Sequence, residues 1–98
     1  MEETKIAELK ARNGEVYEIE VEKEGKVVKG YFKKPNLQII SAASKYANED
    51  PIKSGEILFD SCWLDGDMEM RNDDEIKVAA MGSLSNLFKL LEAKIKKL

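Results

Sequence analysis

The sequence contains no histidine among its 98 residues. Histidine is the commonest general base near neutral pH and the commonest metal ligand in proteins. Its absence excludes a Ser-His-Asp triad, a Cys-His nucleophile and a histidine-based zinc site within one chain. We therefore predict no catalytic residue, no cofactor and no metal, and a protein that is not an enzyme.

Cysteine is nearly absent too, because Cys62 is the only one. A single cysteine cannot form a disulfide within the chain, which agrees with a cytoplasmic location. The apolar neighbours Phe59, Trp63 and Leu64 predict a buried, unreactive thiol. No apolar run approaches the roughly 20 residues of a membrane span, and the acidic start MEETK is unlike a signal peptide.

The charge balance argues against nucleic acid as a partner. Sixteen basic and 19 acidic residues give a formal net charge of -3, which does not attract a polyanion. A small basic cluster lies near Tyr31, but acidic residues across the predicted hairpin cancel much of its charge. We predict a protein partner, and neither nucleic acid nor membrane. The basic residues are Lys26, Lys29, Lys33 and Lys34, and the acidic ones are Glu18, Glu20 and Glu22.

Residues 15–33 carry the clearest local pattern, because apolar residues alternate with glutamates as in a half-buried strand. A two-residue turn at Glu24-Gly25 predicts an antiparallel β-hairpin. This register places the apolar side chains of both strands on one face and pairs Glu20 with Lys29 on the other. Since two strands alone are marginally stable, helices or another chain must cover the apolar face.

Start and stop signals predict four helices around this hairpin. Asn13-Gly14 ends a first helix, Asn36 and Asp50-Pro51 cap the next two, and the acidic run Asn72–Glu75 resembles a capping box. The predicted fold class is α+β in a single domain, residues 1–98. Its elements are a short helix at 2–12, the hairpin at 15–33, and helices at 36–48, 51–63 and 73–97, the last one long.

The end of the last predicted helix carries a heptad-like apolar seam. Leu84, Phe88, Leu91, Ile95 and Leu98 follow one another at intervals of 4, 3, 4 and 3 residues. One interpretation is that this stripe packs on the hairpin. The other is that part of it meets a partner chain or a second copy, so homo-oligomerisation stays open.

The stretch CWLDGDMEM, residues 62–70, is the strongest candidate for a metal site. Asp65, Asp67 and Glu69 match positions 1, 3 and 5 of a calcium loop. However, Met70 replaces the glycine at position 6, and Ile76 replaces the bidentate acid at position 12. We therefore predict a helix-to-helix connection here, and keep a weak metal- or small-molecule-binding module as an alternative.

The order of motifs resembles small phage and prophage proteins of the tail assembly chaperone type. The segments YFKKPNLQIISAAS and DPIKSGEILFDSCWLDGD are followed by an acid-capped helix that ends in leucine and lysine. The similarity covers roughly residues 14–98. It includes the Lys34-Pro35 and Asp50-Pro51 steps, Cys62-Trp63-Leu64 and Gly66-Asp67.

This resemblance implies a non-enzymatic protein that binds the long tape measure protein during tail assembly. Such proteins keep the helical apolar surface of that partner from aggregating and guide tail-tube proteins onto it. Many are made in a short and a frameshifted longer form, and they are typically absent from the mature virion. If the resemblance holds, partner contact is expected at Leu84, Phe88, Leu91 and Ile95, with Tyr31 on the hairpin as a weaker candidate. A self-associating structural or regulatory protein that uses the C-terminal helix is the main alternative.

Overall fold

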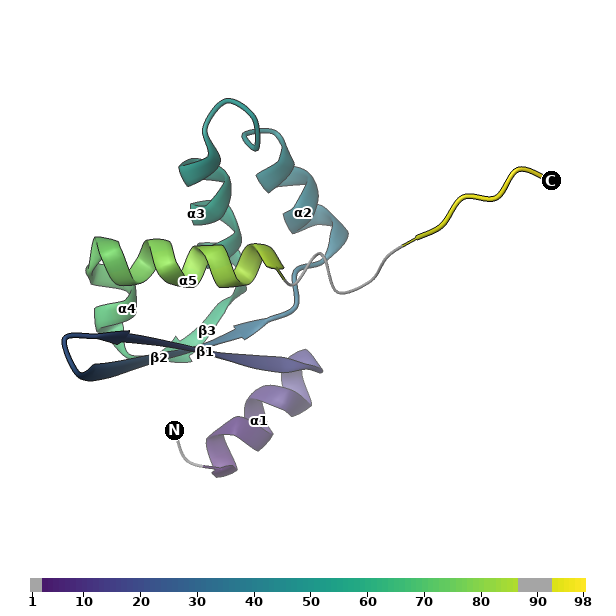
Figure 1. The fold of residues 1–98 in the computed structure, drawn as a ribbon. Helices are drawn as coiled ribbons and strands as arrows, with labels where there is room; N and C mark the ends of the chain where they lie inside the picture. Colours follow the sequence, from purple (N-terminus) through teal and green to yellow (C-terminus); the bar gives the residue numbers. More distant parts are fainter. Residues whose placement is uncertain (1–2, 87–92) are drawn as a thin grey trace.

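The computed structural model describes residues 3–86 and 93–98 (Figure 1). Its helices and strands form an α+β fold with one three-stranded antiparallel sheet of order β1-β2-β3. In chain order the elements are α1 (Glu3–Asn13), β1 (Val16–Lys23), β2 (Lys26–Lys33), α2 (Leu37–Ser44), α3 (Pro51–Cys62), β3 (Trp63–Gly66), α4 (Met68–Asn72) and α5 (Asp74–Asn86).

The predicted hairpin and its register are confirmed. Lys23 pairs with Lys26, and the pairing continues without interruption to Val16 and Lys33. The turn residues Glu24 and Gly25 have φ angles of 52° and 78°. Positive φ at both central turn positions is the geometry that matches the twist of the flanking strands.

The core lies between the sheet and the helices on one of its faces. Ile19, Val28 and Phe32 project from β1 and β2 into a cluster with residues of α3, α4 and α5. The other members are Phe59, Cys62, Met70, Ile76, Ala80, Met81 and Leu84. Figure 1 shows α1 on the opposite side of the sheet from α2, α3 and α5, and no described residue of α1 is buried. Helices therefore cover the apolar face of the hairpin, as expected.

The third strand was not predicted. Residues 63–66, expected to lie at the end of a helix and in a connection, pair with β2 as β3. Gly30 lies opposite Gly66 and Tyr31 opposite Asp65, and the register then shifts before Phe32 pairs with Trp63. A four-residue strand with such an irregularity is too short to show alternation, which is why the pattern missed it. The two facing glycines were the available signal of close backbone approach.

The predicted helix at 36–48 is too long, because α2 ends at Ser44. The next residues form turns, in which the Tyr46 amide donates to the Ala43 carbonyl and the Ala47 amide to the Ser44 carbonyl. The Ser54 hydroxyl also donates to Ala43 at 2.8 Å. These bonds take up carbonyls left at the helix end, so the chain turns toward α3 four residues early.

The predicted long final helix at 73–97 is wrong in its C-terminal part. Helix α5 is described as far as Asn86, and residues 93–98 are neither helix nor strand. Residues 87–92 lie outside the described part of the chain. Residues 93–98 are exposed throughout, and a helical segment of this length without tertiary contacts is marginal in water.

Helix caps were predicted better than helix ends. The Asn36 side chain accepts from the Ile39 amide at 2.9 Å, and the Asp50 side chain accepts from the Lys53 amide at 3.1 Å. The last cap is wrong by one residue: Asp73, rather than Asn72, accepts from the Ile76 amide. Asn72 is still part of α4, so its backbone is not free to begin the next helix.

The Gly30–Gly66 contact predicts a strong effect of a single methyl group. A Cβ on Gly66 would meet the Lys29 carbonyl oxygen at 2.6 Å and the Gly30 Cα at 2.7 Å, at a φ of 139°. We expect Gly66→Ala to lower the free energy of unfolding by about 2–4 kcal/mol, because both a strained φ and backbone crowding oppose it. Urea denaturation followed by circular dichroism measures this.

Gly82→Ala is the matched control. No atom lies within 4 Å of a Cβ at this exposed helical position. Alanine there should raise stability by about 0.5–1 kcal/mol. Equal effects of the two substitutions would contradict the role of the glycine contact.

Candidate partner-binding surfaces

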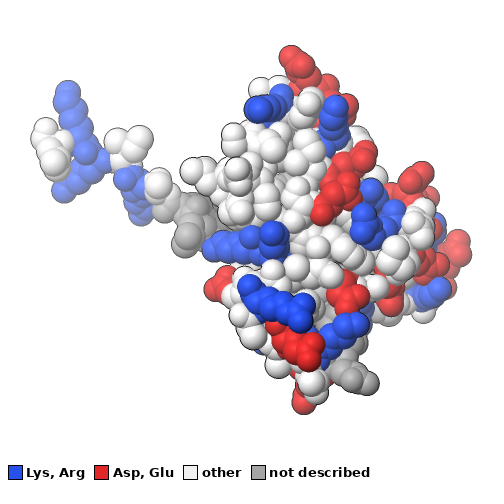
Figure 2. Space-filling model, turned by 180° about the vertical axis from the view of Figure 1, so that it is seen from behind, with Lys and Arg blue, Asp and Glu red and all other residues white. Residues whose placement is uncertain are grey.

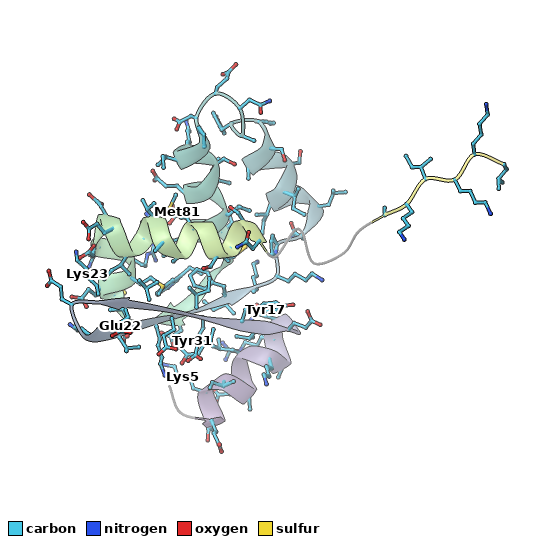
Figure 3. All side chains as sticks on the ribbon, viewed as in Figure 1. Lys5, Tyr17, Glu22, Lys23, Tyr31 and Met81 are labelled. Carbon is cyan, nitrogen blue, oxygen red and sulfur yellow. The ribbon has the colours of Figure 1, made fainter. Side chains whose placement is uncertain are left out.

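The three acidic side chains of the CWLDGDMEM stretch each bind a different group of the protein. The Asp65 carboxylate accepts from the Gly66 amide and forms an ion pair with Lys5 of α1 at 2.9 Å. Lys5 is the main reason that the pKa of Asp65 is lowered from its usual value. These contacts tie α1 to β3, and Figure 3 shows Lys5 on the side of the sheet where α1 lies.

The next two acids join the connection to β2. The Asp67 carboxylate accepts from the Lys29 amide at 2.9 Å, and the Asp67 amide donates to the Lys29 carbonyl at 2.8 Å. Glu69 forms an ion pair with Lys26 at 2.9 Å, which raises the pKa of Lys26. Within residues 3–86 and 93–98, no three metal-ligating side chains converge on one point.

A second ionic cluster joins the hairpin turn to the start of α5. Lys23 lies 2.8 Å from Asp73 and 3.2 Å from Glu75. The hydrogen bond from Lys23, followed by that from the Ile76 amide, lowers the pKa of Asp73. The pKa of Lys23 is raised by the same two carboxylates. The carboxylate of Asp73 thus binds both Lys23 at the hairpin tip and the Ile76 amide at the start of α5.

Cys62 and Trp63 belong to the core. Cys62 is fully buried, and burial raises the pKa of its thiol, so it is less ionised than a free cysteine. The Trp63 ring stacks on Phe59 with centroids 5.5 Å apart and meets Phe32 edge-on at 5.4 Å. The structure agrees with the prediction of a buried thiol.

The structure describes three of the five predicted partner-contact residues, and these three do not form one surface. Leu84 is buried in the core, whereas Ile95 is fully exposed in a segment without secondary structure. Phe88 and Leu91 lie outside the described residues. Tyr31 is buried on the sheet face opposite the core, and its hydroxyl donates to Glu18 at 2.9 Å. Burial, followed by this bond, raises the pKa of Tyr31 to about 12. Leu84 and Tyr31 are therefore not available for partner contact in this structure.

A groove between α3 and α5 is a candidate surface with an apolar lining. It encloses about 390 Å³, and its apolar lining comes from Ile52, Val78 and Met81. Ile52 is 52% exposed, and Val78 is 48% exposed. Charged side chains of both signs rim the groove, namely Glu56, Asp74, Arg71 and Lys77.

The basic side of the rim is held in place by neighbouring groups. Asp60 lies 3.8 Å from both Arg71 and Lys77. The Lys77 ammonium also lies over the Phe59 ring at 5.2 Å, and the Arg71 guanidinium over Trp63 at 5.5 Å. Such cation–aromatic contacts restrict both side chains beside the groove.

Helix α2 forms a second region without charge. No residue from Leu37 to Ser44 carries a charge, and Leu37 is 81% exposed. Viewed from behind, charges of both signs are interspersed over the surface, with an uncharged area among them (Figure 2). The sequence predicted this helix and its cap at Asn36.

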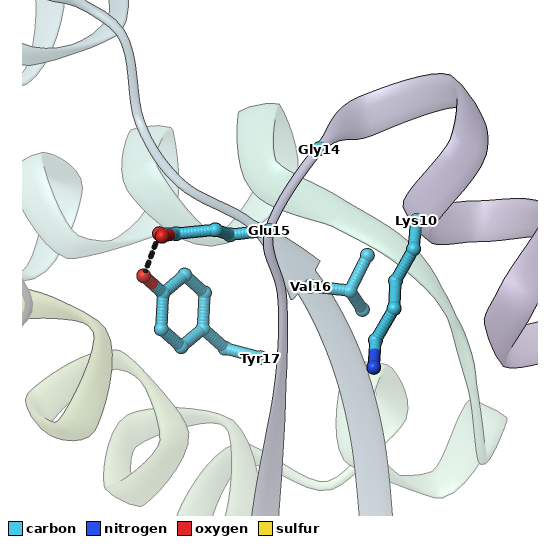
Figure 4. A pocket seen from close by; sticks show the side chains of 5 residues that line it. All are labelled: Lys10, Gly14, Glu15, Val16 and Tyr17. Atoms are coloured by element: carbon cyan, nitrogen blue, oxygen red, sulfur yellow. Dashed lines mark hydrogen bonds between the residues drawn. The ribbon is translucent and has the colours of Figure 1, made fainter.

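A shallow depression of about 450 Å³ lies where α1 meets β1. Glu15 and Tyr17 project to one side of the strand, and Val16 and Lys10 to the other (Figure 4). The Tyr17 hydroxyl donates to the Glu15 carboxylate, which raises the pKa of Tyr17. Glu15 and Tyr17 bind each other, whereas Lys10 lies on the other side of the strand, so these polar groups do not converge on a common centre.

The fold defines an α+β protein with helices on both sides of a three-stranded sheet. A solved structure with a similar fold is an uncharacterised protein, rbstp2171, from Bacillus stearothermophilus. The TM-score is 0.66 at 25% sequence identity, over 94% of this chain and 99% of that one. No family model and no curated protein matches the chain. In the described part of the chain, every helix is too short or too polar to cross a membrane.

Asp73 predicts how stability depends on pH. Its pKa in the folded protein lies below the ordinary value of 3.8. Its contribution to stability is therefore complete above the unfolded pKa and is lost as the pH falls through the folded pKa. The urea concentration at the midpoint of unfolding should therefore decrease when the pH is lowered below about 4. In Asp73→Asn this midpoint should depend less on pH. An unchanged slope in Asp73→Asn would contradict the assignment.

The loop contacts also predict the response to calcium. Since Asp65, Asp67 and Glu69 each bind a different group, millimolar calcium should leave the melting temperature unchanged. A ligand that binds the native state must raise that temperature. A calcium-dependent rise in melting temperature that disappears in Asp67→Asn would support the metal-binding alternative instead.

Proposed function

We propose that this protein is a non-enzymatic phage tail assembly chaperone or adaptor, which binds a helical segment of a structural partner such as the tape measure protein. The proposal starts from the resemblance in motif order over roughly residues 14–98. It includes action in the cytoplasm of the host cell.

The groove between α3 and α5 is the observation that carries the proposal. Ile52 and Val78 leave apolar surface open over the buried Met81. A helix that presents apolar residues at intervals of three and four could insert one or two side chains there. The rim carries charges of both signs. These charges would determine the orientation in which the helix binds, and would contribute less to its affinity.

The C-terminal residues extend the same proposal. Ile95 and Leu98 are fully exposed in the described segment 93–98. If residues 93–98 form a helix on the partner, as segments that order on binding do, the predicted apolar seam that also includes Phe88 and Leu91 would add apolar contacts. The neighbour rbstp2171 has no stated activity, so the fold similarity does not itself supply a function.

Affinity capture from cells that carry the gene, after prophage induction, tests the proposal. Mass spectrometry should identify one long, helix-rich tail protein as the main partner. Ile52→Asp with Val78→Asp should reduce its recovery at least about tenfold, because each aspartate would be desolvated in an apolar contact. Phe88→Asp should weaken the recovery as well.

Met68→Asp is the matched control, since Met68 is an exposed apolar residue on α4 outside the groove lining. It should leave recovery of the partner unchanged. Capture of no tail protein by the wild-type chain would contradict the proposed function. Capture that resists both groove substitutions would move the contact to another surface.

A further inference from the structure

The backbone of β1 presents an open edge to the exterior of the sheet. In the described part of the chain, β2 is the only strand that pairs with β1. The direction of the open groups follows from Lys29, which lies opposite Glu20. Both the amide and the carbonyl of Lys29 bond to Asp67 on the β3 side. Glu20 therefore receives no bond from Lys29, and its own amide and carbonyl point away from β2.

The same reasoning applies to alternate residues along the strand. In an antiparallel pair, hydrogen-bonded and non-hydrogen-bonded residue pairs alternate. Glu18, Glu20 and Glu22 therefore all direct their amides and carbonyls to the open edge. The side-chain carboxylate of Glu18 already binds Lys29 and Tyr31. Figure 3 shows Glu22 and Tyr31 on the side of the sheet that faces away from α5.

Pairing of two β1 edges with each other is disfavoured by charge. Antiparallel pairing through the open groups would place the glutamates of one copy directly opposite those of the other. Like charges at directly opposed positions destabilise a sheet. This edge is therefore protected against β1–β1 association but attracts a strand with basic residues at alternate positions.

The chain contains such a segment at its C-terminus. Residues 93–98, AKIKKL, have no secondary structure and are exposed throughout (Figure 1). Lys94 and Lys96 are separated by one residue, Ile95, as required for two side chains on one face of a strand. This spacing equals that of Glu20 and Glu22.

We propose that residues 93–98 of one copy pair antiparallel with the open edge of β1 in a second copy. Lys96 then lies opposite Glu20 and Lys94 opposite Glu22. This register puts Ile95 opposite Val21, on the face that packs against the core cluster. Reciprocal exchange between two copies gives a closed dimer. The inference goes beyond the proposed function, since the occupant is this chain and not a tail protein.

Charge reversal in both partners tests the pairing. Light scattering and sedimentation velocity at rising protein concentration should show a monomer–dimer equilibrium that weakens with salt. Glu20→Lys with Glu22→Lys, or Lys94→Glu with Lys96→Glu, should each weaken dimerisation at least about tenfold. The variant with all four reversals should regain most of the association. Glu8→Lys with Glu49→Lys is the control with the same change in charge, at exposed positions outside the sheet, and it should still dimerise.

Amide hydrogen exchange separates this arrangement from a dimer of C-terminal helices. The amides of Glu18, Glu20 and Glu22 should exchange rapidly in the monomer and slowly in the dimer. A monomer at all concentrations would overturn the inference. So would a dimer that persists after deletion of residues 93–98, a dimer with unprotected β1 amides, or failure of the four-residue reversal to restore association.

Discussion

The close approach of Gly30 and Gly66 is the contact on which the arrangement of the second half of the chain depends. Because neither residue has a side chain, β3 can lie against β2 with Trp63 and Met70 packed around Gly30. That position brings the Trp63 ring onto Phe59 and Phe32 and sets the direction in which α4 leaves the sheet. The short backbone distance between the two glycines thus positions β3, and the aromatic contacts then stabilise the core between the sheet and the helices.

The charged residues define where the segments meet, although each ion pair alone adds little to stability. Lys5, Lys23 and Lys26 each bind an acid far away in sequence, so their contacts join α1 to β3 and the hairpin tip to α4 and α5. Asp73 combines such a pair with a helix cap, which makes the hairpin position and the start of α5 interdependent. The acidic loop that resembles a metal site in sequence therefore has a structural role in each of its carboxylates.

Local rules predicted what local interactions determine. The hairpin register followed from alternation and a two-residue turn, and the caps at Asn36 and Asp50 from side chains that bond within three residues. The third strand and the end of α2 depend on contacts with residues distant in sequence, which periodicity does not contain. The same limit applies to the candidate surfaces. Leu84 and Tyr31 have the residue types of contact sites, but the fold buries both, whereas Ile52 lies half-exposed in the lining of the groove.

The distribution of apolar residues along α5 links the fold to binding. The side chains that α5 buries end with Leu84, while Val78 on the same helix stays half exposed beside Ile52. Ile95 and Leu98, in the described segment 93–98, are fully exposed. Isolated helical or extended segments of this length gain too little to offset their conformational entropy. A second chain can supply the missing contacts in two ways, as a helix in the groove or as a sheet edge for the segment 93–98. Pairing with the edge of β1 is favoured by its glutamates only when the incoming segment has lysines at alternate positions, as residues 93–98 do.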